Sequence, residues 1–217
     1  AMIKLESGEV FEAAGVSAHA STPEEGNNAI TEVMRLAAEK YGEKCPLAEI
    51  YMKKIGFTLH GEKSSCSFHD EESGSLTMNV GTIGLVDSKL VLGIDIRYPV
   101  TVSHTTVEKG IREAFEPEGF EVSVEEIMEP VFMEKEGRVI EQLTDAYRYV
   151  TGRNDEPSVI GGGTYARAME NIVAFGPVIP GHPCTEHMKN ESISTEDFYA
   201  AAEIYRTALL KLAAVQK

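Results

Sequence analysis

Residues 89–97 read KLVLGIDIR, a run in which apolar side chains occupy every second position. Such alternation places successive side chains on opposite faces of a β-strand, so one face of this strand is apolar. The preceding run, residues 76–86, is also rich in apolar and β-branched residues, and the dipeptide Asp87-Ser88 between the two runs is typical of a turn. We therefore predict a β-hairpin over residues 76–97, which Pro99 ends.

The chain before the hairpin has a strand pattern followed by a helix pattern. Residues 10–16 are short and mostly apolar, and residues 27–42 place apolar side chains at helical spacing. Residues 43–75 are polar and contain glycine and serine, with one weakly apolar piece. We predict that this third stretch is an insertion.

The chain after the hairpin repeats the order of helix and strand. Ser103 is a suitable N-cap for a helix that runs to about Phe115, and residues 120–127 alternate again. The complete order of strand, helix, two strands, helix and strand predicts a ferredoxin-like βαββαβ domain. The fold class is then α+β, with a four-stranded sheet covered by two helices on one face.

The pattern changes after residue 130. Helices are predicted over residues 137–151 and 195–214, and short strands over residues 158–160 and 172–175. Helices that alternate with short apolar strands are typical of an α/β domain with a parallel sheet. The segment is too small to be a whole domain of that kind, so we interpret it as the closing part of one.

Composition excludes several classes of function. The chain has 217 residues, 42% of them hydrophobic, and a formal net charge of −15. This charge opposes binding to nucleic acid or to anionic membranes, and no apolar run approaches the length of a bilayer span. The three cysteines have no paired short spacing, which argues against a zinc knuckle or a disulfide scaffold. Without a signal-peptide pattern, we expect a cytoplasmic protein.

Two loops contain histidines that could carry chemistry. His19 lies among small residues between the strand over residues 10–16 and the helix that follows. Residues 181–191 gather two histidines and two carboxylates just before the last helix, and both groups are common ligands of catalytic zinc. The His-x4-His spacing is not by itself a standard chelate, so a solvated polar loop is the alternative for residues 181–191. For His19 the alternative is a loop histidine hydrogen-bonded to backbone.

Four motifs together carry a resemblance to a known family. Residues 19–29 match the pattern H-x-S-x-P-x-x-G-x-N-A, and residues 95–99 read DIRYP. Residues 161–167 read GGGTYAR, and residues 185–191 read TEHMKNE. The chain resembles the second half of the zinc metallopeptidases that include Xaa-His dipeptidase (the carnosinase-like bacterial dipeptidase V), aminoacylase and succinyl-diaminopimelate desuccinylase. The last two motifs resemble the dipeptidase branch in particular.

The resemblance implies roles for two residues of the ferredoxin-like part. His19 would reach the scissile carbonyl oxygen of a dipeptide and stabilise the oxyanion. Arg97 would bind the terminal carboxylate of the substrate through its planar guanidinium group. The ferredoxin-like domain would then be the lid domain of the family, which clamps the substrate and mediates dimerisation.

The resemblance also implies roles for residues of the C-terminal motifs. The backbone of residues 161–164, with Gly162, Gly163 and Thr164 as the expected substrate-binding residues, would donate hydrogen bonds near the same carboxylate. His187 would be the C-terminal ligand of a two-zinc site.

The remaining catalytic groups of the family do not occur in this sequence. They are a His-x-Asp strand end, a bridging aspartate and a Glu-Glu pair whose first member is the general base. Glu24-Glu25 lies inside the first motif and Glu71-Glu72 in the stretch 43–75, so neither pair has that position. Because two-metal hydrolysis needs all these groups, we expect the chain to be inactive alone.

The predicted organisation is therefore a lid domain over residues 2–130 and the C-terminal remnant of a catalytic domain over residues 131–217. The expected function is that of the substrate-clamping half of a zinc-dependent dipeptidase, with an N-terminal catalytic half and a second copy of the chain as partners. Half of a desuccinylase or aminoacylase is an alternative. A non-catalytic dimerisation or interaction module is another.

Overall fold

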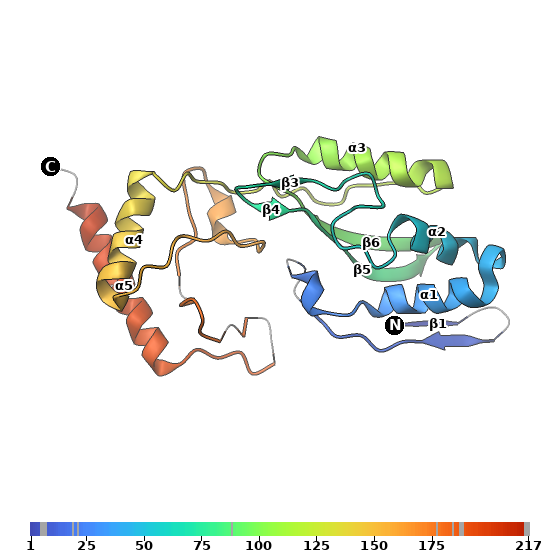
Figure 1. The fold of residues 1–217 in the computed structure, drawn as a ribbon, viewed down its shortest axis with the longest axis horizontal. Helices are drawn as coiled ribbons and strands as arrows, with labels where there is room; N and C mark the ends of the chain where they lie inside the picture. The colour runs from blue at the N-terminus through green and yellow to red at the C-terminus, as the bar shows by residue number, and fades with distance from the viewer. Residues whose placement is uncertain are drawn as a thin grey trace. The chain divides into compact units, whose positions relative to one another are not determined.

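The computed structural model describes residues 1–4, 8–18, 20, 22–87, 89–176, 178–183, 185–186 and 189–214. The chain divides into two compact units (Figure 1). Unit 1 consists of Ala1–Pro130 with Ile160–Gly162, and unit 2 of Val131–Val159 with Gly163–Lys217. Helices and strands both occur, so the chain is α+β as predicted. None of the helices in the described residues is long and apolar enough to cross a membrane.

The predicted hairpin is the longest β structure of unit 1. Strands β5 (Thr77–Val86) and β6 (Lys89–Arg97) pair antiparallel, with Thr77 opposite Arg97 and a bulge after Val80. The alternation noted in the sequence turns the apolar side chains of both strands towards the core of the unit. The polar side chains at the end of β6 therefore lie on the opposite face of the strand.

Three helices pack around the hairpin in unit 1. They are α1 (Ala29–Tyr41), α2 (Pro46–Lys54) and α3 (His104–Phe115). The side chain of Asn28 caps α1 by accepting hydrogen bonds from two backbone N–H groups of the first turn. The side chain of Ser103 caps α3 by accepting one hydrogen bond, from the backbone N–H of Thr106, as its position in the sequence predicts.

Short elements complete unit 1. Among its described residues, two further antiparallel pairs of strands are present in addition to the hairpin, and three 3₁₀ turns flank the helices. The strands are β1 (Met2–Lys4), β2 (Val10–Glu12), β3 (His69–Asp70) and β4 (Gly74–Ser75), and the turns are η1 (Pro23–Glu25), η2 (Gly42–Lys44) and η3 (Glu116–Glu118).

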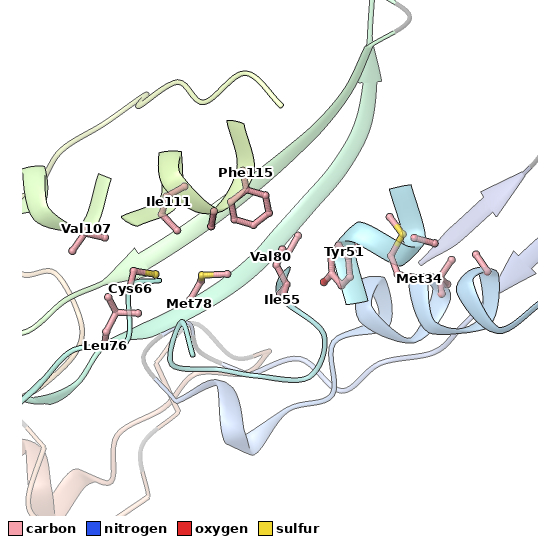
Figure 2. Packing of buried hydrophobic residues seen from close by; sticks show 14 of the residues in the cluster. Met34, Tyr51, Ile55, Cys66, Leu76, Met78, Val80, Val107, Ile111 and Phe115 are labelled. Atoms are coloured by element: carbon pink, nitrogen blue, oxygen red, sulfur yellow. The ribbon is translucent and has the colours of Figure 1, made fainter. Parts of the chain in front are cut away.

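One hydrophobic core holds unit 1 together (Figure 2). Met34 of α1, Met78 of β5 and Ile111 of α3 all contribute to it. Residues 43–75, which the sequence pattern marks as an insertion, supply Tyr51 and Cys66 to the same core, both almost completely buried. The stretch is therefore an integral part of the packing of unit 1.

In the described residues of unit 1, no sheet has the four strands that the sequence pattern predicts. The first predicted strand, over residues 10–16, is shortened to β2, which pairs with β1. The described residues 120–127 contain no strand, although Phe120 and Val122 pack against the core. Alternation decides which side chains point inwards, but a strand also needs a neighbouring strand to pair with, and no strand in the described part of the chain pairs with these residues.

Unit 2 is built on two packed helices, α4 (Arg138–Thr151) and α5 (Thr195–Ala213), with the single turn η4 (Tyr165–Ala168) between them in sequence. The strands predicted over residues 158–160 and 172–175 are wrong, because both stretches are irregular. Unit 2 has no strand among its described residues with which a short apolar run could pair.

Candidate functional site

Arg97 stands at the end of β6, where the structure orients its guanidinium group. Nε lies 3.2 Å from Oδ1 of Asp95 and donates a hydrogen bond to it. Nη1 donates to the carbonyl oxygen of Gly161, which belongs to the same unit. Nη2 makes no hydrogen bond to any described residue. The guanidinium group is thus held on two sides and keeps donors for a planar anion such as a carboxylate.

Polar residues continue from Arg97 across the hairpin. Asp95 lies opposite Asn79 in the register of β5 and β6. The amide nitrogen of Asn28 donates to Oδ1 of Asn79 at 3.0 Å and to the carbonyl oxygen of Val80 at 2.8 Å. Asn28 therefore caps α1 and also ties the start of that helix to β5. Sequence reasoning assigned no role to Asp95, although its position two residues before Arg97 places both on one face of β6.

The two ends of the loop that carries the first motif pair with each other, and a glycine next to each end allows the close approach. Val16 and Asn27 form an isolated antiparallel bridge, with backbone hydrogen bonds of 3.0 and 2.9 Å. A Cβ atom on Gly15 would lie 2.4 Å from the carbonyl oxygen of Asn27, and one on Gly26 would lie 2.7 Å from that of Val16. Only glycine fits this close approach of the two backbones.

The same loop is attached to the hairpin next to the Arg97 position. Oγ1 of Thr77 donates to the carbonyl oxygen of Ala20 at 3.3 Å, and Thr77 is the register partner of Arg97. The structure thus brings Ala20 of the first motif to the strand pair that ends in Arg97. His19 lies outside the described residues, so its role as an oxyanion donor stays a prediction.

The glycine-rich motif is divided between the two units. Gly161 and Gly162 belong to unit 1, and Gly163 and Thr164 to unit 2. The hydroxyl oxygen of Thr164 accepts a hydrogen bond from the backbone N–H of Ala166 and caps η4. No described residue accepts a hydrogen bond from the backbone N–H groups of Gly162, Gly163 or Thr164. The role of Gly162, Gly163 and Thr164 in substrate binding stays a prediction.

Asp70 fixes the segment that follows Arg97. Its carboxylate accepts hydrogen bonds from the backbone N–H and hydroxyl groups of both Ser73 and Thr101, at 2.6 to 3.2 Å. Burial, the largest single influence, raises the pKa of Asp70, but the donors of Ser73 and Thr101 together outweigh it and lower the pKa to about 2. The ionised carboxylate thereby joins the turn between β3 and β4 to the chain that leaves β6.

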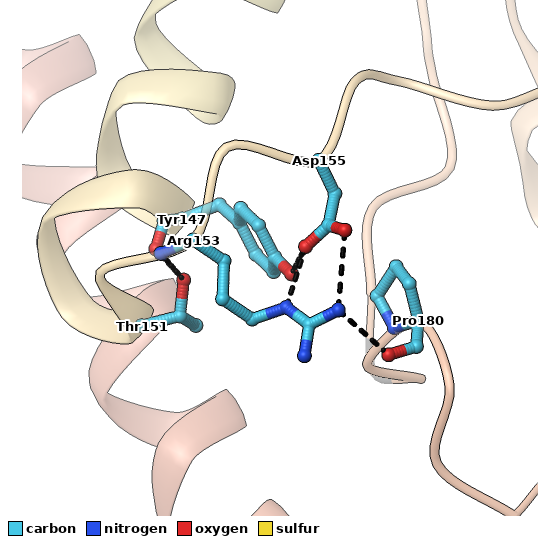
Figure 3. Close-up of polar contacts among 5 residues, drawn as sticks. All are labelled: Tyr147, Thr151, Arg153, Asp155 and Pro180. Atoms are coloured by element: carbon cyan, nitrogen blue, oxygen red, sulfur yellow. Dashed lines mark hydrogen bonds and ion pairs between the residues drawn. The ribbon is translucent and has the colours of Figure 1, made fainter.

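A polar cluster in unit 2 holds the loop that precedes the fourth motif (Figure 3). Asp155 accepts hydrogen bonds from Nε and Nη2 of Arg153 at 2.5 and 3.1 Å, and from the Tyr147 hydroxyl at 2.5 Å. Arg153, and after it Tyr147, lowers the pKa of Asp155 to about 2. Nη2 of Arg153 also donates to the carbonyl oxygen of Pro180 at 2.9 Å. The end of α4 is therefore tied to residue 180.

The loop is tied to α5 on its other side. Nδ1 of His182 lies 2.8 Å from Oδ1 of Asp197, which is in the first turn of α5. Thr185 and Ser192 exchange two hydrogen bonds, in which Oγ1 of Thr185 donates to the carbonyl oxygen of Ser192 and accepts from its N–H. These contacts close the chain around the fourth motif.

The expected metal ligand cannot be placed within this loop. His187 lies outside the described residues, so its assignment as a zinc ligand stays a prediction. The described residues contain no group of three or more His, Cys, Asp or Glu side chains that could hold a metal ion.

Comparison with known protein families shows to which family the chain belongs. The sequence pattern that defines the peptidase family M20/M25/M40 matches residues 47–211, most of both units. The chain belongs to this family. The match includes Arg97, the glycine-rich motif and most of α5, and it confirms the metallopeptidase relationship expected from the four motifs. Peptidases of the M20 family are generally metal-dependent.

Individual relatives of this M20 family member carry dipeptidase names. The "Putative dipeptidase YtjP" of Bacillus subtilis is 33% identical over 205 residues, which are 92% of this chain and 43% of that protein. A "Putative dipeptidase" of Staphylococcus haemolyticus is 34% identical over 154 residues, which are 70% of this chain and 33% of that protein. One of Staphylococcus saprophyticus is 31% identical over 206 residues, or 94% and 44%. The chain spans less than half the length of these relatives.

Proposed function

We propose that this chain is the substrate-clamping part of a zinc-dependent dipeptidase and that it hydrolyses dipeptides only together with a catalytic half. Residues 2–130 would be the lid domain, related to the ferredoxin-like type, and residues 131–217 the C-terminal part of the α/β catalytic domain. Membership of the peptidase family and the names of the relatives support this assignment. The scattered spacing of the three cysteines favours the cytoplasm as its location.

The observation that carries the proposal is the state of the Arg97 side chain. Asp95 and Gly161 hold the guanidinium group by Nε and Nη1, and Nη2 has no partner among the described residues. A guanidinium group fixed in this way has already lost most of its rotational freedom. It can therefore bind both oxygens of a carboxylate at a smaller entropic cost. The terminal carboxylate is what all dipeptides share whatever their side chains, so it is a fitting target for a clamp.

The chemistry of hydrolysis would be shared between this chain and its missing half. Zinc ions, when bound, would supply the polarisation of the carbonyl group and the activation of water. His187 would hold one of these ions. His19 would donate a hydrogen bond to the carbonyl oxygen as it gains negative charge, so His19→Ala is expected to lower kcat by about 10²-fold.

The proposal is tested with two substrates that differ only in the carboxylate. The chain is mixed with zinc and with the part of the Bacillus subtilis relative that lies outside the match. Hydrolysis of a dipeptide is then compared with that of its C-terminal amide. The wild-type chain is expected to favour the free dipeptide, and Arg97→Ala to remove that preference by raising KM at least tenfold for the dipeptide alone.

Arg112→Ala is the matched control, because Arg112 is also a partly exposed, ion-paired arginine of unit 1 but lies on α3. It should keep the preference for the free carboxylate. If Arg97→Ala kept it as well, Arg97 would not be the carboxylate clamp. If the mixture cleaved only N-acyl amino acids, the chain would be half of a related amidohydrolase, and no hydrolysis of any of these substrates would favour the non-catalytic module.

A further inference from the structure

Asp95 contacts Arg97 at one nitrogen only. The two residues are two positions apart on β6, so their side chains lie on the same face of the strand. Oδ1 of Asp95 accepts a hydrogen bond from Nε of Arg97 at 3.2 Å. A guanidinium group can bind a carboxylate through two N–H groups at its side edge, which includes Nε, or at its end edge, formed by Nη1 and Nη2. Asp95 therefore occupies the side edge and leaves the end edge.

The end edge of Arg97 is only partly used. Nη1 carries two N–H groups, one of which donates to the carbonyl oxygen of Gly161, while Nη2 donates to no described residue. The carbonyl group of Gly161 is uncharged. Among the described residues, Asp95 is thus the only carboxylate that pairs with Arg97.

Arg153 shows the same kind of pair in a saturated form (Figure 3). Asp155 also lies two residues from its arginine, but it accepts from both Nε and Nη2, at 2.5 and 3.1 Å. Nη2 of Arg153 donates in addition to the carbonyl oxygen of Pro180. A pair closed in this way joins two segments of the chain. The single contact of Asp95 orients its arginine without saturating it.

Two arginines on helices of unit 1 are saturated as well. Arg35 and Arg112 each pair with two glutamates that lie three or four residues away. The chain has 35 acidic and 20 basic residues, so carboxylates are in excess. A freely rotating Arg97 would be open to the same saturation. Asp95 prevents this by holding the side chain at Nε, on the face of β6 that points away from the core.

We propose that Asp95 is a positioning residue for substrate binding: it fixes Arg97 by Nε, so that the end edge of the guanidinium group receives the terminal carboxylate of a dipeptide. Asp95 itself would not touch the substrate. A side chain that is fixed before the ligand arrives loses less entropy on binding, which is worth about twofold to tenfold in affinity. This inference rests on the proposed function, because it refines how the clamp is built.

The test compares two substitutions of Asp95 in the reassembled peptidase. The chain is mixed with zinc and with the part of the Bacillus subtilis relative outside the match, and KM and kcat are measured for a dipeptide and its C-terminal amide. Asp95→Ala removes the acceptor for Nε and should raise KM for the dipeptide about threefold to tenfold, with kcat unchanged. KM for the amide should stay the same, because the amide offers no carboxylate to Arg97.

Asp95→Asn distinguishes positioning from charge. Its side-chain oxygen still accepts a hydrogen bond from Nε, although the negative charge is gone. If Asp95 acts by position, Asp95→Asn should keep KM for the dipeptide within about twofold of the wild-type value, well below the rise expected for Asp95→Ala. If Asp95 acts by charge, the two variants should behave alike.

Glu116→Ala is the matched control. The side chain of Glu116 is 48% exposed, against 49% for Asp95, and it also pairs with an arginine of unit 1. This variant should leave both KM values unchanged. Half-exposed ion pairs add little stability, so Asp95→Ala should unfold at the wild-type temperature. If it does not fold, Asp95→Ser, whose side chain is too short to reach Nε, takes its place with the same expected rise in KM.

A binding measurement on the chain alone makes the test independent of catalysis. The Nε–H signal of Arg97, identified by its loss in Arg97→Lys, is followed by NMR while alanyl-alanine or its amide is added to the labelled chain. The wild-type chain and Asp95→Asn should respond to alanyl-alanine at concentrations about threefold to tenfold lower than Asp95→Ala does. None of them should respond to the amide.

The outcomes separate this inference from the proposed function. An unchanged KM in folded Asp95→Ala, or a rise that Asp95→Asn shares in full, would overturn the role of Asp95. A preference for the free dipeptide that still depends on Arg97 would then keep the proposed function. A mixture that cleaves no dipeptide would refute the dipeptidase, and the NMR titration would decide on Asp95 alone. A response that depends on Asp95 would uphold the positioning role, and any other result would refute it.

Discussion

Units 1 and 2 bury their apolar side chains in different ways. Unit 1 has one continuous core, to which α1, α2, α3 and the hairpin all contribute. In unit 2 the described core is little more than the seam between α4 and α5, and large apolar side chains such as Tyr149 and Leu209 remain exposed. The difference indicates that unit 1 holds most of its stabilising contacts in one shared core, whereas the described residues of unit 2 share a much smaller one.

The largest effect is expected from a core truncation in unit 1. Leu76 is completely buried, and Leu76→Ala should lower the free energy of unfolding of unit 1 by about 3 to 5 kcal/mol, through lost burial and the cavity left behind. Hydrogen exchange of β5 amides measures this loss for the unit itself. Val86→Ala, at an exposed position of β5, should change the free energy of unfolding by less than about 0.5 kcal/mol. A loss below about 1 kcal/mol for Leu76→Ala would show that the core of unit 1 is loosely packed.

The same substitution in unit 2 should cost less. Leu143 of α4 is 9% exposed and packs in the smaller core, so Leu143→Ala is expected to cost about 2 kcal/mol, the lower end of the range for leucine truncation. Hydrogen exchange of α4 amides is the measurement. A cost as large as that of Leu76→Ala would remove the contrast between the two units.

Gly110 provides a smaller test, of how closely unit 1 is packed. A Cβ atom there would lie 2.4 Å from the carbonyl oxygen of Ser65. Alanine favours a helix by about 1 kcal/mol over glycine, but overpacking costs about 1 to 3 kcal/mol. We expect Gly110→Ala to be destabilising by about 1 kcal/mol in urea unfolding, and Gly84→Ala, where nothing lies within 4 Å, to be neutral or stabilising. A stabilised Gly110→Ala would mean that residues 43–75 yield easily to α3.

Local patterns in the sequence predict part of this architecture well. The hairpin follows from the alternation in residues 76–97, and Ser103 caps α3 because its hydroxyl group can satisfy a backbone N–H of the first turn. Strand patterns elsewhere were not sufficient, since residues 120–127 alternate but pair with no strand among the described residues. Tyr51 and Cys66 were missed because a few buried residues spread over a polar stretch produce no periodic signal.

The candidate site likewise has one part that local sequence predicts and another that it does not. The position of Arg97 at the end of β6 was predictable from its motif and from the hairpin. Its contacts with Asp95 and Gly161, and the contact of Asn28 with Asn79, depend on strand register and on a segment far along the chain. Contacts of this kind arise only on folding, and local sequence does not encode them. The roles of His19 and His187 come from the family resemblance and await experiment.

The smallest effects concern Asp70 of unit 1 and Asp155 of unit 2, whose pKa values both lie at about 2. An aspartate in the unfolded chain has a pKa of about 3.9, so between pH 4 and pH 2 the unfolded state binds more protons than the folded state. Both carboxylates therefore stabilise the fold above pH 4, and this contribution is lost as the pH falls through 2. Asp70→Asn and Asp155→Asn should each flatten the decline of the melting temperature in this range.

Salt distinguishes the two carboxylates. Asp155 is stabilised first by hydrogen bonds from Arg153, a charged donor at a partly exposed site, whereas Asp70 is held by uncharged hydroxyl and backbone donors. Screening weakens an exposed ion pair much more than such hydrogen bonds. Raising the salt concentration to about 1 M should therefore remove most of the difference in melting temperature between Asp155→Asn and the wild type. The corresponding difference for Asp70→Asn should remain. An equal response of both variants to salt would mean that the two units hold their ionised aspartates in the same way after all.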